Sequence, residues 1–223
     1  MHVDDAITSR RSVRRFLPTP VEREVVEHIL RVASRAPSGS NIQPWKVHVV
    51  TGTVLERLST ALIAAADSSP DTEQPEYTYY PREWFEPYLS RRRACGFGLY
   101  DKLGIARGDK PARHRQMLRN FLFFDAPVGL IVTIDRRLET GSYMDAAMLV
   151  QNILVSARGQ GLHTCAQAAF AGYHGVVRQH LPMTDDEILL CGISLGYEDP
   201  NAAENHFVTE RVPLSEFTTF SGY

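Results

Sequence analysis

The sequence lacks the features that mark a membrane, secreted or metal-binding protein. Its longest apolar runs, such as residues 128–132, are far shorter than the ~20 residues that cross a bilayer. Its first eleven residues are charged and contain no apolar stretch, so we expect no secretory signal. Cys95, Cys165 and Cys191 are isolated and form no CxxC pair, which predicts neither a disulfide framework nor a metal site. We therefore expect a cytoplasmic protein without membrane contact.

The sequence also lacks the local signatures of several common active sites. It contains no GxxxxGK[ST] phosphate loop, no GxGxxG after a predicted strand and no HExxH motif, and its eight histidines are scattered. Nucleophilic catalysis by the protein has little support, so we expect a cofactor to carry the reaction. A net charge of −2 and a pI near 6.4 argue against nucleic-acid binding.

Two short segments near the N-terminus carry the strongest signal that is present. The first, Arg10-Arg11-Ser12-Val13-Arg14, packs three guanidinium groups and a hydroxyl into five residues. Guanidinium forks match phosphate oxygens in bidentate geometry, so this segment predicts a phosphate site. Taken alone, it would more often be a solvated basic face.

The second segment is Pro37-Ser38-Gly39-Ser40-Asn41-Ile42-Gln43-Pro44-Trp45, which begins about 23 residues after the first. Its small polar residues would let backbone amides approach a ligand closely, and it leads directly into a predicted strand. Alone, it could be an ordinary loop between a helix and a strand. The presence of both segments at this spacing favours a site for one phosphorylated, planar ligand.

Together the two segments resemble the flavin-binding signature of the nitroreductase family, and the resemblance covers nearly the whole chain. Members of that family are homodimers that hold FMN at the subunit interface. The second segment matches the family's PSxxNxQPW pattern at every specified position. The resemblance implies a cofactor site formed by Arg10, Arg11, Ser12, Arg14, Pro37, Ser38, Gly39, Asn41, Gln43, Asn120, Gln167, Ala168, Ala169 and Arg211.

The resemblance also implies a role for individual residues. Arg10 and Ser12 would contact the phosphate, and Arg14 would reach the pyrimidine edge of the ring, where positive charge raises the reduction potential. Ser38 and Asn41 would come from the neighbouring subunit. Arg211 would close on the phosphate, although a surface arginine is an equal alternative, and Thr209 stands where some relatives carry a second basic residue.

Two later segments would complete the cofactor site. The segment 164–169 would pass its backbone beside flavin N5, with one amide N–H directed at that atom; its Cys165 is expected to be a small buried apolar residue. Arg119 and Asn120 would supply polar contacts to the ring. Gln151 and Asn152 are expected to be hydrogen-bonded polar residues of the core.

The predicted fold is α+β. The resemblance implies a single nitroreductase-like domain over residues 1–223, with three layers and a central mixed, mainly antiparallel sheet flanked by helices, in an intertwined homodimer. Periodicity predicts helices at 3–9, from an N-cap at Thr19 to Pro37, at 54–66 and at 142–160, the last a buried helix with Met144, Met148, Gln151 and Val155 at helical spacing. Strands are predicted at 45–50, 128–134 and 187–195, and a loop at 68–76.

Two further segments are expected to act at the site. Residues 77–110 are rich in aromatics and resemble an insertion over the active site in the longer, nitroaromatic-reducing branch of the family. Their aromatic side chains would either wall the substrate slot or pack the insertion onto the body. Residues 200–223 form an aromatic C-terminal extension, which must cover some surface and is expected to lie on the partner subunit.

The resulting functional prediction is an FMN-dependent oxidoreductase with a ping-pong mechanism. It would pass a hydride from NADH or NADPH through flavin N5 to nitroaromatic or quinone-like acceptors. Its expected partners are a second copy of the chain and small aromatic acceptors. Two alternatives remain open: a flavin-cleaving or reductive dehalogenating member of the same fold, and a non-catalytic FMN-binding or storage protein.

Overall fold

The computed structural model describes residues 1–68 and 75–222. Its centre is a four-stranded sheet in the order β1-β2-β4-β3, with every neighbouring pair antiparallel. The strands are β1 (Trp45–Thr51), β2 (Val128–Asp135), β3 (His163–Gln167) and β4 (Glu187–Gly196). A parallel contribution comes from an isolated bridge between Ser12 and Thr164 at the free edge of β3.

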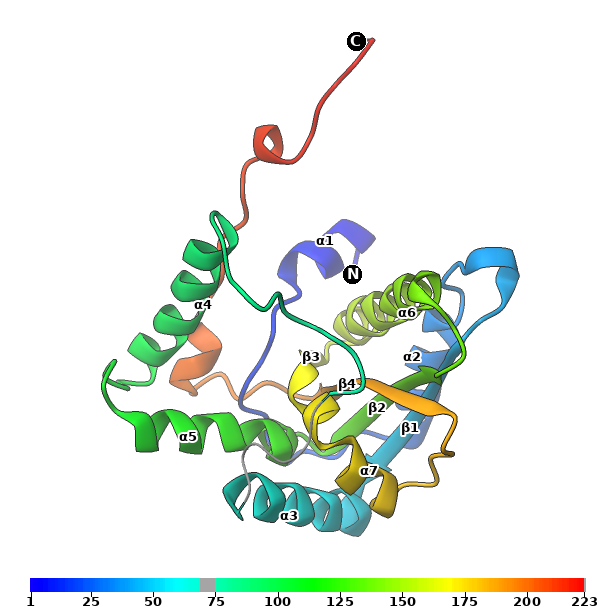
Figure 1. The fold of residues 1–223 in the computed structure, drawn as a ribbon, viewed down its shortest axis with the longest axis horizontal. Coiled ribbons are helices and arrows are strands. Elements are labelled where there is room, and N and C mark those ends of the chain that lie inside the picture. Colours follow the sequence, from blue (N-terminus) through cyan, green and yellow to red (C-terminus); the bar gives the residue numbers. More distant parts are fainter. Residues whose placement is uncertain (69–74, 223) are drawn as a thin grey trace.

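Helices cover both faces of the sheet. They are α1 (Val3–Ser9), α2 (Arg23–Ala33), α3 (Gly52–Ser68), α4 (Tyr88–Lys102), α5 (Lys110–Leu118), α6 (Thr140–Gly159) and α7 (His174–His180). Helices α2 and α6 lie on one face, and α3 and α7 lie on the other (Figure 1). The predicted three-layer α+β architecture is therefore confirmed. No described helix is both long enough and apolar enough to span a membrane.

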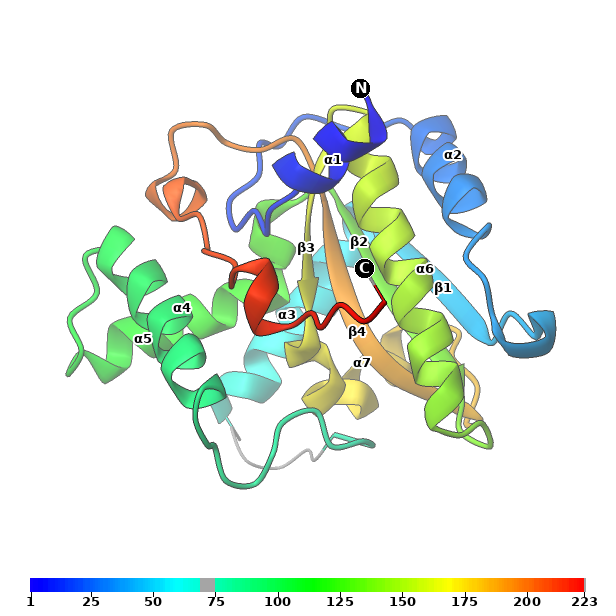
Figure 2. The same ribbon diagram turned by 90° about the horizontal axis from the view of Figure 1, so that it is seen from above.

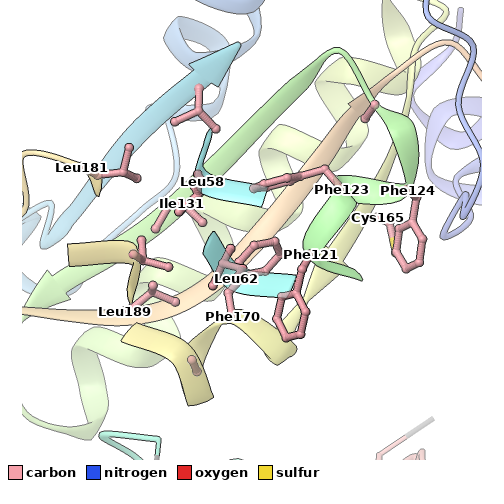
Figure 3. Close-up of a cluster of buried hydrophobic side chains, with 14 of the residues drawn as sticks. Leu58, Leu62, Phe121, Phe123, Phe124, Ile131, Cys165, Phe170, Leu181 and Leu189 are labelled. Atoms are coloured by element: carbon pink, nitrogen blue, oxygen red, sulfur yellow. The ribbon is translucent and has the colours of Figure 1, made fainter. Parts of the chain in front are cut away.

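Strands β2 and β4 run through the middle of the sheet, so their residues are buried on both faces. This burial confirms the strands predicted from near-continuous apolar runs at 128–134 and 187–195. On the α3 face, aromatic rings pack directly against strand backbone (Figure 3). A Cβ atom on Gly129 would come within 2.6 Å of the Phe123 ring, and one on Gly192 within 2.4 Å of the Phe170 ring. Glycine at these two positions lets the rings approach the strand backbone closely.

The predicted start of α2 is wrong. The helix begins at Arg23 with Glu22 as its N-cap, and it ends at Ala33, before the predicted end at Pro37. The backbone N–H of Leu17 donates to the carbonyl of Tyr197 at 2.8 Å, which fastens the preceding segment alongside the end of β4. Leu17 and Thr19 each precede a proline, and residues in that position avoid helical backbone angles. The chain therefore turns into the helix only after Pro20.

The other predicted helices are present. Helix α1 has the predicted bounds, but its N-cap is His2, whose Nδ1 accepts from the backbone of Asp4. The segment 77–110 contains α4, which is followed along the chain by α5 (Figure 2). The loop predicted at 68–76 lies mostly outside the described residues.

Helix α6 is confirmed, but its predicted buried face is wrong. Met144 is 66% exposed and Met148 is 37% exposed. The residues that pack on the sheet are instead Leu149, Ile153 and Ala157. Helix α6 is apolar on two sides, and periodicity cannot tell which side faces the sheet of the same chain.

The C-terminal segment extends away from the rest of the molecule (Figure 1). Leu214, Phe217 and Phe220 along it are each more than half exposed.

Candidate active site

The arginine-rich segment 10–14 lines a cavity of about 850 Å³, which we call the arginine cavity. Its walls come from the end of α1, from α4, from the middle of α6 and from the C-terminal segment. The lining residues are Ile7, Thr8, Ser9, Arg10, Arg11, Ser12, Arg14, Cys95, Gln151, Phe207, Val208, Thr209 and Arg211. The structure thus brings Arg211 to the same cavity as Arg10, Ser12 and Arg14, although they are about 200 residues apart in sequence.

The charges in this cavity are positive and largely uncompensated. Burial lowers the pKa of the Arg10 guanidinium, and the positive charge of Arg211 lowers it further. No described acidic residue lines the cavity, and Arg10 has no carboxylate partner in the described chain. Two guanidinium groups that repel each other in a half-buried cavity favour a bound anion. Together with the Ser12 hydroxyl, this donor set fits a terminal phosphate.

The backbone of the segment 10–14 is fixed by hydrogen bonds to its neighbours. Val13 is fully buried, and its N–H donates to the Thr164 carbonyl of β3 at 3.0 Å. Because side chains alternate along an extended segment, Ser12 and Arg14 point to the opposite side from Val13. Both line the cavity.

Arg11 differs from the other arginines of the segment because its guanidinium has partners inside the chain. It donates to the carboxylate of Glu198 at 2.5 Å and to the carbonyl of Asn205 at 2.8 Å. Glu198 also pairs with Nε2 of His163 at 3.0 Å. Burial, then the positive charges of Arg158 and Arg11, lower the pKa of His163 to about 4. Arg11 therefore holds the segment in place from within the protein.

A second cavity of about 340 Å³, which we call the tyrosine cavity, adjoins the first. Gln151 lines both cavities, so they meet at the middle of α6. The tyrosine cavity is lined by Tyr77, Tyr79, Tyr143, Ala146, Ala147, Val150, Gln151, Ala166, Gln167, Ala168, Leu190 and Cys191. The predicted core role of Gln151 is therefore wrong, whereas Asn152 does bond within the chain, donating to the Ala33 carbonyl at 3.3 Å.

Tyr77, Tyr79 and Tyr143 form one side of the tyrosine cavity, which we call the tyrosine wall, and Tyr77 is fixed to β4. The Tyr77 hydroxyl donates to the Leu190 carbonyl at 2.5 Å, and its ring packs against Tyr143 with centroids 5.7 Å apart. Burial raises the pKa of Tyr77, so this hydroxyl stays protonated. Tyr79 packs edge-on against Tyr77 at 6.2 Å and remains 58% exposed. The aromatic segment after residue 76 thus contributes one fixed and one exposed ring to the cavity.

The segment predicted to lie beside flavin N5 borders the tyrosine cavity. The Gln167 side chain is committed inside the protein: it donates to the Asn120 carbonyl at 2.8 Å and accepts from the Ser194 hydroxyl at 2.6 Å. Residues 166–168 are all among the residues that line the tyrosine cavity. Ala169 packs against the core, and Asn120 lies behind Gln167. The neighbouring Arg119 forms a bidentate pair with Asp125 at 2.8 and 2.6 Å.

Burial of Cys165 agrees with its predicted role as a small apolar residue. Its side chain is 3% exposed, and burial raises the pKa of its thiol.

The loop 37–43 lies elsewhere in the molecule and lines neither cavity. It packs against the N-terminal half of α6, where the Gly39 N–H is shared between the two Asp145 carboxylate oxygens at 3.3 Å each. Ser40, Asn41 and Gln43 all have positive φ angles, between 48° and 57°. Such angles are uncommon for residues other than glycine and concentrate at ligand-binding segments. Within one chain, the structure does not bring this loop to the arginine cavity.

One serine motif in the sequence is structural. Residues 192–196 fit the GxSxG pattern, which marks the nucleophile of many hydrolases. In a hydrolase that serine stands exposed on a sharp turn between a strand and a helix. Here Ser194 is fully buried in β4, and its hydroxyl donates to Gln167.

Comparisons with known proteins agree with this arrangement. Residues 7–197 match the family model described as Nitroreductase family. The chain is 44% identical over 218 residues to a nitrobenzene nitroreductase of Ectopseudomonas oleovorans, covering 98% of this chain and 96% of the relative. It is 38% identical over 220 residues to a 4-nitrobenzoate reductase of Pseudomonas putida, covering 99% and 96%.

Two solved structures are similar over almost their whole length. The FMN and NADPH-dependent nitroreductase NfnB from sphigopyxis sp. strain HMH superposes with a TM-score of 0.96 at 37% identity, with both chains fully covered. The FMN-dependent nitroreductase NfnB from Mycobacterium smegmatis, solved in complex with NADPH, gives a TM-score of 0.93 at 32% identity over 98% of this chain and 97% of that chain.

Proposed function

The chain belongs to the nitroreductase family, and on that premise we propose that it is an FMN-dependent oxidoreductase that passes a hydride from NAD(P)H to nitroaromatic or quinone-like acceptors. The observation that carries the proposal is the arginine cavity, in which Arg10 and Arg211 have no carboxylate partner among the described residues and which shares Gln151 with the tyrosine cavity. Bound FMN would accept and then donate the hydride at N5.

The residues of the chain divide the work of binding between the two cavities. Arg10, Arg211 and the Ser12 hydroxyl would hold the phosphate, because they line the arginine cavity and none of them has a carboxylate partner among the described residues. Arg14 would place positive charge at the pyrimidine edge of the ring. The backbone of residues 166–168 would border the ring, and Tyr77, Tyr79 and Tyr143 would wall the face on which donor and acceptor bind.

The protein in this proposal acts by positioning the bound molecules. No protein side chain is assigned as an acid, because solvent can supply protons to an acceptor in an open slot.

We also propose that the working unit is a homodimer that shares its two flavin sites. Three exposed features support it: the outward face of α6 with Met144 and Met148, the strained loop 37–43, and the C-terminal segment that extends from the body. An apolar helix face and an aromatic extension need a covering surface. A second copy would supply that surface and bring Ser38, Gly39 and Asn41 to the arginine cavity.

Identification of the cofactor tests the proposed function. The purified protein should show a visible flavin absorption band, and heating should release FMN, identified by chromatography against FMN, FAD and riboflavin. Recovery of FAD as the main species would contradict a cavity built for one terminal phosphate. Absence of any flavin after reconstitution with FMN would contradict the proposal as a whole.

A further inference from the structure

Asn205 lies beside the N-terminal arginine segment, in the stretch of chain that leads to Arg211. It belongs to the short 3-10 turn Ala203–His206, between the end of β4 and the C-terminal segment that carries Arg211. Its side chain is only 2% exposed, although the turn is at the surface of the molecule. A buried asparagine outside a helix or strand needs partners for its amide.

The partners of the Asn205 amide are backbone groups of two segments, residues 14–15 and the loop after β4. Its Oδ1 accepts from the N–H of Arg14 at 2.8 Å. Its Nδ2 donates to the carbonyl of Arg15 at 2.8 Å and to that of Asp199 at 2.9 Å. One side chain thus provides hydrogen-bond partners for backbone groups of two segments, the N-terminal arginine segment with Arg15 and the loop after β4.

Asn205 and Glu198 act on the same segment from neighbouring positions. The Asn205 carbonyl accepts from Nη1 of Arg11, and the carboxylate of Glu198 accepts from Nη2 of the same guanidinium. The segment 10–14 belongs to neither a helix nor one of the four strands, so these bonds and its contact with β3 fix its position. Arg211 follows Asn205 by six residues, so the same turn sets where Arg211 enters the cavity.

We propose that Asn205, with Glu198 beside it, is a positioning residue that holds Arg10, Ser12 and Arg211 at the separation required by the cofactor phosphate. This inference rests on the proposed FMN site. Asn205 does not line the cavity. It acts through the backbone of Arg14 and through the path of the C-terminal segment. Loss of the Asn205 amide should therefore weaken the binding of the phosphate strongly. It should weaken the binding of the rest of the flavin much less.

The test compares FMN with riboflavin, which lacks the phosphate. Apoprotein is titrated with each flavin, the dissociation constants are measured from flavin fluorescence, and their ratio reports the contribution of the phosphate. In Asn205→Ala, the buried Arg14 N–H loses its acceptor, and the Kd for FMN should rise roughly 10- to 100-fold. The Kd for riboflavin should change much less, so the ratio should collapse.

Two further variants keep the test decisive. Asn201→Ala changes an exposed asparagine four residues earlier in the same loop and should retain the wild-type ratio. Glu198→Gln keeps the shape of the second partner of Arg11 and should lower the ratio in the same direction, which decides the matter if Asn205→Ala does not fold. A wild-type ratio in folded Asn205→Ala, or an equal loss of both affinities, would overturn the inference. A wild-type protein that binds both flavins equally would instead contradict the proposed phosphate site.

Discussion

Single side chains in the arginine cavity differ in whether they are free to bind a ligand. The Arg11 guanidinium donates hydrogen bonds to Glu198 and Asn205. Arg10 has no carboxylate partner among the described residues, and the positive charge of Arg211 contributes to lowering its pKa. The order of residues in the motif does not reveal this difference. Of the two adjacent arginines, Arg10 is the one available to a phosphate.

Replacement of Arg10 should therefore weaken cofactor binding directly. Arg10→Ala leaves a partly desolvated phosphate without one of its charged donors, and the binding free energy for FMN should fall by ~2–4 kcal/mol. Fluorescence titration of apoprotein measures this change. Arg31→Ala, which alters an exposed arginine of α2, is the matched control and should bind FMN as wild type does. Unchanged flavin affinity in Arg10→Ala would remove Arg10 from the site.

Glu187 is a buried carboxylate that serves the fold. Its side chain is 2% exposed at the start of β4. Burial alone would raise its pKa, but hydrogen bonds from Thr133 at 2.6 Å, His48 at 2.8 Å and the Thr184 N–H at 3.1 Å hold the pKa at about 2. The charged form is thus favoured more in the folded protein than in the unfolded chain.

This lowered pKa predicts a pH-dependent contribution to stability. The contribution is fully present above the ordinary Glu pKa of 4.5 and is lost as the pH falls from 4.5 toward 2. At neutral pH, Glu187→Gln should lower the free energy of unfolding by ~2–3 kcal/mol, and the difference from wild type should shrink across that window. Urea unfolding at fixed protein concentration measures it, with the exposed Glu83→Gln as control. A difference that does not vary with pH would contradict this account of Glu187.

At the scale of elements, α6 organises the site from both of its faces. Leu149 and Ile153 pack it onto the sheet, while Gln151 and Val150 line the tyrosine cavity. Asp145, near its start, holds the loop 37–43 through the Gly39 N–H. One helix thereby links the ligand cavities of a subunit to the loop proposed to serve the other subunit.

Mixed dimers test whether that loop acts across the interface. Arg10→Ala and Asn41→Ala should each bind FMN poorly as separate homodimers. When the two variants are unfolded together and refolded, a mixed dimer pairs the intact Arg10 of one subunit with the intact Asn41 loop of the other. One of its two sites is then complete, so flavin binding and nitroaromatic reduction should partly return. If the loop served its own subunit, mixing would restore nothing.

Sequence periodicity predicted the existence of these elements better than their limits or faces. The strands at 128–134 and 187–195 were predictable because burial on both sides demands continuous apolar residues. The start of α2 was not, because the hydrogen bond from Leu17 to Tyr197 joins segments far apart in sequence. The buried face of α6 was missed because the opposite face is apolar as well.

At the scale of the whole molecule, the two cavities share Gln151, and each is built from distant parts of the chain. The sequence indicated Arg10, Ser12 and Arg14 because charge and motif spacing are local signals, and it indicated Arg211 through the resemblance to the family. It gave no sign of Asn205 or Tyr143, whose roles depend on what the fold places beside them. The role of the loop 37–43 cannot be read from one folded chain either, since its proposed site lies on a second copy.

If donor and acceptor both bind in the tyrosine cavity, the reaction should proceed in two separate steps. The cavity of about 340 Å³ is lined by one set of residues, so donor and acceptor should compete for it and bind in turn. Each half of the reaction should then proceed without the other substrate present. Exposed Tyr79 at the mouth is consistent with exchange of one aromatic molecule for another.

The most direct test of the account is to observe the two halves of the reaction separately in the flavin absorption of the purified protein. Without oxygen or acceptor, NADPH or NADH should bleach the visible flavin band completely. After removal of the nicotinamide, nitrobenzene alone should restore the band and be reduced in proportion. The proposed function would be contradicted if the protein had no flavin band, or if neither nicotinamide bleached the band. The proposed acceptors would be contradicted if neither nitroaromatics nor quinones restored the bleached band.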